Sequence, residues 1–125
     1  MADAGVSYRD LKVWQKAMDL TVSCYKATQT YPADERFGLT AQMRRSAVSV
    51  ASNIAEGYGR DSDGSFVHFL RISQGSLKEL ETQIIVSGRI GVMNSSSADS
   101  LLSATDEIGR MLRGLINSLN SKSAK

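Results

Sequence analysis

The side chains best suited to chemistry are concentrated in one segment, residues 42–60. Two adjacent cations, Arg44 and Arg45, are followed by hydroxyl, amide and carboxylate groups at spacings of three and four residues. These polar positions are Gln42, Arg45, Ser49, Asn53, Glu56 and Arg60, with Ser52 beside them. Residues three and four apart share one face of an α-helix. The segment is therefore predicted to be a helix whose polar stripe could be an active site, a nucleic-acid surface or part of an interface.

The sequence contains no established catalytic or metal-binding motif. His68 is the only histidine and Cys24 the only cysteine, whereas a zinc site draws several Cys and His ligands from close spacings. Di-iron sites in helical bundles need Glu-x-x-His motifs, which this sequence lacks. Gly57 and Gly59 follow a predicted helix, whereas the glycines of the dinucleotide-binding motif follow a strand. We therefore expect a protein that is not an enzyme, with no catalytic residues, no metal and no cofactor.

The composition of the polar stripe distinguishes an interface from an ordinary solvated face. Solvated helix faces favour Lys and Glu, whereas Ser and Asn are poorer helix formers. The stripe is also flanked by Ala47 and Ala51, whose small side chains permit close packing. We therefore favour a polar network or interface that fixes helix register or oligomeric state, and a solvated face remains the alternative. The candidate members are Arg45, Ser49, Asn53 and Glu56, with Ser76 and Glu79 on the following helix.

Other cations are candidates for contacts with phosphate groups. Adjacent helix residues point about 100° apart, so Arg44 and Arg45 are not expected to face one partner. The formal net charge is only +2, and no basic tail is present, so bulk charge does not by itself indicate a nucleic-acid binder. The candidates for contact with an RNA or DNA backbone are Arg44, Arg60, Lys12 and Lys16. Charges scattered for solubility remain the alternative.

Four amphipathic segments with short connections must position these residues. Apolar residues recur at spacings of three and four, which is typical of helices. The expected helices cover residues 10–29, from 35 or 40 to 58, from the connector at 61–65 to 89, and from 96 to 119. Short loops make successive helices antiparallel neighbours. The sequence therefore predicts an all-α fold, an antiparallel up-down-up-down four-helix bundle.

Several residues are expected to end or to pack these helices. Asp34 and Ser96, the latter in a capping box with Asp99, are predicted N-caps. The segment 57–59 is expected to end the second helix with a glycine in the left-handed conformation. The costly helical glycine Gly75 is expected to permit close approach of another helix. The first helix carries two neighbouring apolar seams, so the bundle could cover one seam and another subunit the other.

The length of the chain indicates one domain of ordinary size. Residues 1–125 are predicted to form a single four-helix bundle, with a core over about residues 8–119 and a frayed polar tail at 120–125. Cys24 lies among apolar helix residues and is expected to be a buried, inert thiol. Neither a signal peptide nor a run of about 18 apolar residues is present. We therefore expect a cytoplasmic protein without a membrane segment.

Three blocks in the same order resemble one bacterial family. Residues 8–17 are similar to the pattern f-x-d-L-x-V-W-q-k-A, and residues 42–57 to Q-x-R-R-A-x-x-S-x-x-x-N-I-A-E-G. Residues 75–83 are similar to G-S-x-x-E-L-x-T-Q. The chain thus resembles, over about residues 8–118, the four-helix-bundle proteins encoded in intervening sequences of 23S ribosomal RNA genes. Three ordered blocks make the resemblance specific.

The resemblance implies an antiparallel four-helix bundle that assembles as a ring-like homopentamer. It also implies a relation to the accessory variability proteins of diversity-generating retroelements, which are basic and bind nucleic acid alongside a reverse transcriptase. The implied partners are therefore further copies of the chain, RNA or DNA, and a reverse transcriptase or another protein. The net charge of +2 departs from the basic relatives. A structural or protein-interaction scaffold without nucleic-acid binding is the alternative function.

Overall fold

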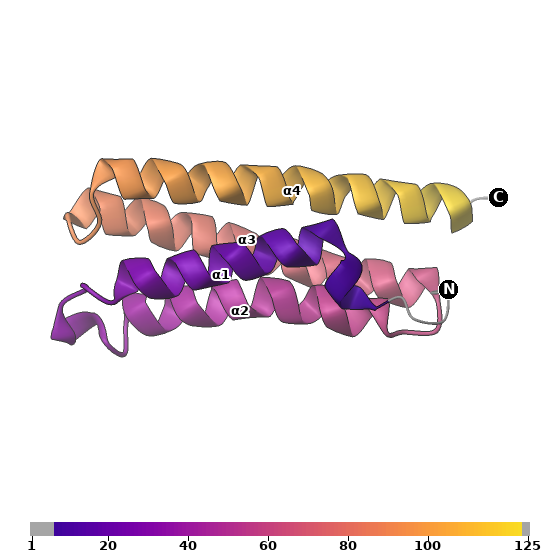
Figure 1. The fold of residues 1–125 in the computed structure, drawn as a ribbon, viewed down its shortest axis with the longest axis horizontal. Helices are drawn as coiled ribbons and strands as arrows, with labels where there is room; N and C mark the ends of the chain where they lie inside the picture. The colour runs from indigo at the N-terminus through magenta and orange to yellow at the C-terminus, as the bar shows by residue number, and fades with distance from the viewer. Residues whose placement is uncertain (1–6, 124–125) are drawn as a thin grey trace.

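The structure is a computed structural model that describes residues 7–123. Within them the chain forms four long helices, α1 (Lys12–Thr28), α2 (Leu39–Tyr58), α3 (Asp63–Ile90) and α4 (Ser95–Ser123). Short 3-10 helices, Tyr8–Asp10 and Ala33–Glu35, precede α1 and α2. Figure 1 shows that each long helix runs antiparallel to the one before it. The predicted all-α, up-down-up-down four-helix bundle is therefore confirmed.

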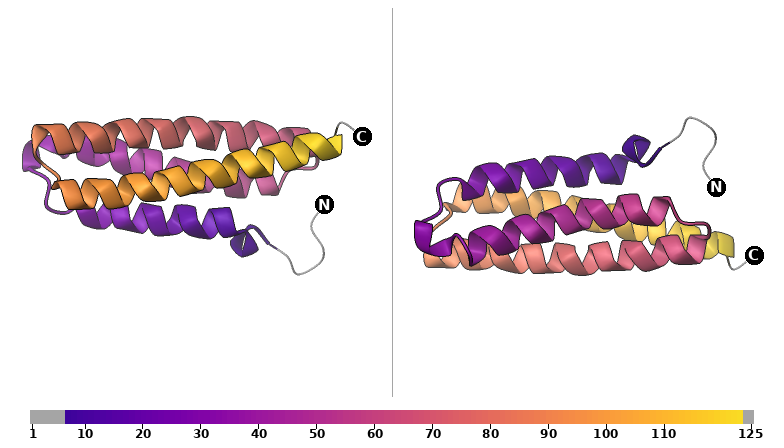
Figure 2. Two further views of the ribbon diagram at one scale, coloured as in Figure 1. Left: turned by 90° about the horizontal axis from the view of Figure 1, so that it is seen from above. Right: turned by 90° about the horizontal axis from the view of Figure 1, so that it is seen from below.

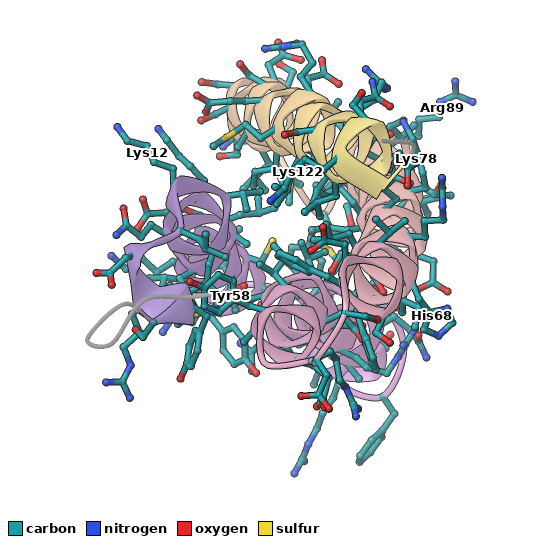
Figure 3. The ribbon with its side chains drawn as sticks, turned by 90° about the vertical axis from the view of Figure 1, so that its right-hand side faces the viewer. Lys12, Tyr58, His68, Lys78, Arg89 and Lys122 are labelled. Carbon is teal, nitrogen blue, oxygen red and sulfur yellow. The ribbon has the colours of Figure 1, made fainter. Side chains whose placement is uncertain are left out.

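The four helices follow one another in chain order around the bundle axis, as the end-on view shows (Figure 3). α2 and α3 are the most closely packed neighbours, and α1 and α4 have the fewest contacts of the neighbouring pairs. α1 and α4 diverge toward the end of the bundle at which α1 begins (Figure 2). The polar stripe predicted within residues 42–60 therefore lies mostly on α2, one of the two most closely packed helices.

The predicted apolar seams meet in one core. The largest fully buried side chains are Met43, Ile54, Leu70, Leu77, Leu80, Ile84, Ile108 and Leu112. Burying each such side chain contributes about 1.5–3 kcal/mol. Cys24 is buried among them, as predicted, and burial raises the pKa of its thiol to about 12. The thiol is therefore neutral near pH 7. Within residues 7–123, no helix is long and apolar enough to cross a membrane.

The start of α2 differs from the prediction. Asp34 lies inside the short 3-10 helix Ala33–Glu35 and does not cap α2, so this predicted N-cap is wrong. The N-cap residue is Gly38, which has no side chain to cap the helix. The backbone N–H of Leu39, the first residue of α2, instead donates to Glu35 Oε1 at 3.0 Å. A carboxylate at this position also interacts favourably with the positive end of the helix dipole.

The start of α4 differs as well. Ser96 and Asp99 are not the predicted capping box, because the helix begins one residue earlier, at Ser95. The side chain of Asn94 accepts from the backbone N–H of Ser97 at 2.8 Å. Asn and Ser are comparable N-cap residues, so composition alone did not separate the two positions.

Two helix ends also differ. Gly59 ends α2 with a φ of −81°, so the predicted left-handed glycine is wrong there. Among the described residues the left-handed conformation occurs at Gly91, whose φ is +85° at the end of α3. α4 continues to Ser123, so residues 120–123 of the predicted polar tail are helical, and their fraying stays a prediction. Residues 124–125 of the predicted tail lie outside the described residues.

Candidate functional site

The polar stripe of α2 turns toward α3 and forms a small hydroxyl and amide network there. The Oγ atoms of Ser49 and Ser76 lie 2.8 Å apart. The Asn53 side-chain amide donates to the backbone oxygen of Ser49 at 2.9 Å and to its Oγ at 3.1 Å. Ser76 is buried, and Ser49 and Asn53 are half-buried. Three of the six predicted network residues therefore meet between α2 and α3, where the hydrogen bond between Ser49 and Ser76 joins the two helices.

The remaining three predicted members lie in exposed ion pairs. Arg45 lies 3.7 Å from the Glu79 carboxylate of α3 and donates twice to the side-chain oxygen of Gln42. Glu56 pairs with Arg60 at 2.7 Å, one turn further along the chain. Exposed pairs of this kind contribute about 0–1 kcal/mol. The predicted stripe is therefore two structures, a half-buried network facing α3 and a solvated row of charges.

Buried hydroxyls outside the stripe also join the helices, and these roles were missed. Ser73 donates to the backbone oxygen of Val50 at 2.8 Å. Thr21 donates to the backbone oxygens of Ala17, at 2.8 Å, and Ala47, at 3.2 Å. The sequence signal that could have revealed these roles was a polar residue at a position of the otherwise apolar helix seam. Small hydroxyl side chains at these positions let neighbouring helices approach closely while each hydroxyl keeps a hydrogen bond.

The glycine that permits close helix packing is Gly57, and Gly75 does not have this role within the chain. A Cβ atom added at Gly57 would lie 2.8 Å from Phe69 Cβ and 2.9 Å from Phe66 Cδ1. A Cβ atom at Gly75 would meet no other atom within 4 Å. The expected close approach at Gly75 is therefore wrong for the helices of this chain, although Ser76, the next residue, does contact α2.

Arg44 is held against the end of α1. Its Nε donates to Thr28 Oγ1 at 2.9 Å, and one of its terminal nitrogens donates to the backbone oxygen of Tyr25 at 3.4 Å. Its guanidinium carbon lies 4.6 Å from the centre of the Tyr25 ring. A cation at the last carbonyls of a helix is stabilised by the helix dipole. Arg44 would therefore have to break these contacts to reach a phosphate.

The other three candidate phosphate contacts lie toward the opposite end of the bundle. Lys12 is exposed at the first residue of α1 (Figure 3). Lys16 lies 3.7 Å from the Glu107 carboxylate of α4. Arg60 pairs with Glu56 and lies over the Phe69 ring at 4.7 Å. The four candidates therefore do not form one patch, since Arg44 lies where α1 ends and the others lie near its start.

An apolar stripe runs along the outer side of α1. Met18, Val22 and Tyr25 are 38%, 49% and 41% exposed, and their spacing of four and three places them on one helix face. Trp14 precedes them on this face and is half-buried. The predicted wide apolar face thus divides into an inner seam that the bundle covers and an outer stripe that it leaves exposed.

Two surface grooves complete the candidate sites. One, of about 500 Å³, lies between the end of α1 and the start of α4 and is lined by Ser23, Lys26, Ala27, Ser96, Ser97, Ser100 and Leu101. The other, of about 400 Å³, lies between α3 and α4 and is lined by Arg71, Gln74, Gly75, Leu77, Lys78, Gly109 and Arg113. Within the described part of the chain, no three His, Cys, Asp or Glu side chains are grouped as a metal site.

The fold and these contacts define a helical-bundle protein in which the half-buried part of the polar stripe of α2 serves the packing of α2 against α3. The sequence model of the 23S rRNA-intervening sequence protein family matches residues 9–114, and the chain belongs to this family. The family resemblance is therefore confirmed, whereas the relation to retroelement accessory proteins stays a prediction.

The chain is also similar to a solved structure. This is the crystal structure of a protein with unknown function from the S23 ribosomal protein family, from Bacteroides thetaiotaomicron. The two chains are 23% identical, the similarity covers 83% of this chain and 97% of that chain, and the TM-score is 0.75. At this identity the likeness supports the fold. No curated protein matches the sequence.

Proposed function

We propose that this chain is a non-catalytic, homo-oligomeric bundle that holds the backbone of RNA or DNA on its assembled surface. The observation that supports the oligomer is the outer stripe of α1, where Met18, Val22 and Tyr25 expose apolar surface along one helix face. Covering such a stripe with a second copy removes it from water. The oligomer is proposed to be the homopentamer that the family resemblance implies.

Assembly would also strengthen an otherwise modest attraction for phosphate. One chain carries a formal charge of +2, so five chains carry +10. Each copy would add Lys12, Lys16 and Arg60, which lie near the end of the bundle at which α1 begins and α2 ends. Contacts made by side-chain cations to phosphates fix position without reading bases. A reverse transcriptase or another protein is the proposed additional partner, and the cytoplasm is the proposed compartment.

A scaffold without nucleic-acid binding is the second candidate. This candidate is favoured because three of the four cations predicted to contact phosphate already interact with other groups of the chain. Arg44 contacts α1, Arg60 pairs with Glu56, and Lys16 lies near Glu107. The exposed pairs are weak enough to exchange for phosphate, whereas Arg44 is half-buried and held by Thr28. The two candidates share the oligomer and differ in the role of the cations.

A gel-shift titration with single-stranded RNA and duplex DNA at low and high salt separates the two candidates. Backbone binding predicts retardation at low salt that weakens as salt rises, because each cation–phosphate contact releases a counterion. Free mobility of both nucleic acids at low salt would contradict the proposal and leave the scaffold. Retardation that is indifferent to salt would also contradict it, since the contacts would not be ionic.

A further inference from the structure

We propose that the groove between α3 and α4 is a phosphate-binding site that seats the backbone of a nucleic-acid strand. This inference rests on the proposed nucleic-acid binding and identifies the surface responsible. The groove lining contains three cations, Arg71, Lys78 and Arg113, and no carboxylate. Figure 3 shows Lys78 on the side of the bundle where α3 and α4 adjoin. None of these three residues is among the four candidates Arg44, Arg60, Lys12 and Lys16.

The arrangement of the cations suits an extended anion. Arg71, Gln74 and Lys78 are spaced by three and four residues, so they lie on one face of α3. Arg71 and Lys78 are seven residues apart, or about 10 Å along the helix axis. Arg113 faces the same groove from α4. The cations thus border the groove on both helices, and Gln74 adds a neutral hydrogen-bonding group between them.

Two of these cations, Arg71 and Arg113, are freer to bind phosphate than three of the four cations predicted from sequence. Within residues 7–123, neither Arg71 nor Arg113 forms an ion pair. Lys78 lies 3.1 Å from the Glu81 carboxylate, but its side chain is 75% exposed. The Glu81 side chain is only 18% exposed. The Lys78 ammonium has three N–H donors, so it can donate to a phosphate oxygen while it keeps its contact with Glu81. Arg44, in contrast, is held by Thr28 and Tyr25.

Two glycines keep the groove open without serving the packing of the chain itself. Gly75 lies in the middle of α3, where glycine costs about 1 kcal/mol relative to alanine. A Cβ atom there would meet no other atom within 4 Å, and one at Gly109 would meet Leu77 at an ordinary 3.6 Å. The fold therefore tolerates alanine at both positions, whereas a group that lies in the groove would not.

A second copy of the chain is the other class of occupant that a glycine-lined groove could take. The charges favour phosphate, because three cations buried against another protein surface would each need a carboxylate partner. Phosphate groups satisfy Arg and Lys side chains directly, and Arg can bind them through two parallel hydrogen bonds.

The test is a fluorescence-anisotropy titration of labelled single-stranded RNA with the full chain and with the double variant Arg71→Gln/Arg113→Gln. A strand that contacts the three cations of one groove should lose about 20-fold in affinity between about 50 and 200 mM salt, and a variant with one remaining cation about 3-fold. The matched control is Arg36→Gln/Arg89→Gln, which removes two exposed charges outside the groove. It should keep the wild-type salt dependence.

Three results would overturn the inference, and they are distinguishable. If the wild-type chain does not bind RNA at low salt, the proposed function itself fails. If it binds and the groove variant keeps its affinity and salt dependence, the strand lies elsewhere. If the groove variant changes oligomer mass and leaves RNA affinity unchanged, the groove is a contact between copies.

A second pair of variants separates the groove from general charge effects. Gly75→Ala should stabilise the chain and weaken RNA binding, because Gly75 lines the groove and the methyl group adds bulk there. Gly114→Ala is the control, since a Cβ atom there also meets nothing within 4 Å and the residue lies outside the groove lining. It should stabilise the chain similarly and leave RNA binding unchanged. Equal RNA affinity in the two variants would contradict a bound strand at Gly75.

Discussion

Alanine in place of Gly57 perturbs the closest approach between α2 and α3. The added Cβ would lie 2.8 Å from Phe69 Cβ and 3.2 Å from the backbone oxygen of Phe66. Neither atom can move aside by a side-chain rotation, so α3 itself must shift. Overpacking of a core costs about 1–3 kcal/mol, and alanine returns up to about 1 kcal/mol of helix propensity. We expect a net loss of about 1–2 kcal/mol in the free energy of unfolding.

Urea unfolding followed by circular dichroism measures this loss, at one protein concentration because assembly also affects stability. Gly114→Ala is the matched control, because it adds the same methyl group where nothing lies within 4 Å. We expect the control to gain up to about 1 kcal/mol, which separates the two variants by about 2–3 kcal/mol. A Gly57→Ala chain as stable as the Gly114→Ala chain would refute the close packing of α2 on α3.

Three further predictions concern the stripe of α1, the network and the buried thiol. Val22→Glu should lower the oligomer mass in sedimentation velocity, because it places a charge in the apolar stripe. Ser23→Glu, one position away on the exposed side of α1, should leave the mass unchanged. Equal masses for the two variants would contradict an interface at the stripe. Asn53→Leu should cost about 1–3 kcal/mol in urea unfolding through its lost hydrogen bonds to Ser49. Glu56→Ala should cost less than about 1 kcal/mol, and the reverse order would refute the division of the stripe. Burial raises the Cys24 pKa from 9.0 to about 12, so its contribution to stability is complete below pH 9 and declines from there toward pH 12. Reaction of Cys24 with a thiol reagent at pH 8 should therefore follow unfolding, and rapid labelling of the folded chain would contradict its burial.

The periodicity of the sequence was sufficient for the fold. Apolar residues at spacings of three and four predict helices wherever they continue, and short loops leave antiparallel packing as the simple arrangement. Helix ends were less predictable, because Asn94 and Ser96 are comparable caps and the choice between them depends on where the first turn of α4 packs.

The candidate site was predictable only in part, because spacing gives the face of a residue and not its partner. Ser49, Asn53 and Ser76 were found on the correct faces and meet between α2 and α3. Arg44 and Arg45 could not be told apart from the sequence, since one finds a helix end and the other a surface carboxylate. A groove shared by α3 and α4 depends on the register between two helices, which no local pattern shows.

Sedimentation equilibrium of the wild-type chain at micromolar concentration tests the central claim of a self-assembling bundle most directly. The chain has a mass of 13.6 kDa, so the proposed homopentamer has a mass of about 68 kDa. We expect a single species of that mass, with the outer stripe of α1 covered by neighbouring copies. A species of 13.6 kDa that stays monomeric across the concentration range would contradict the account.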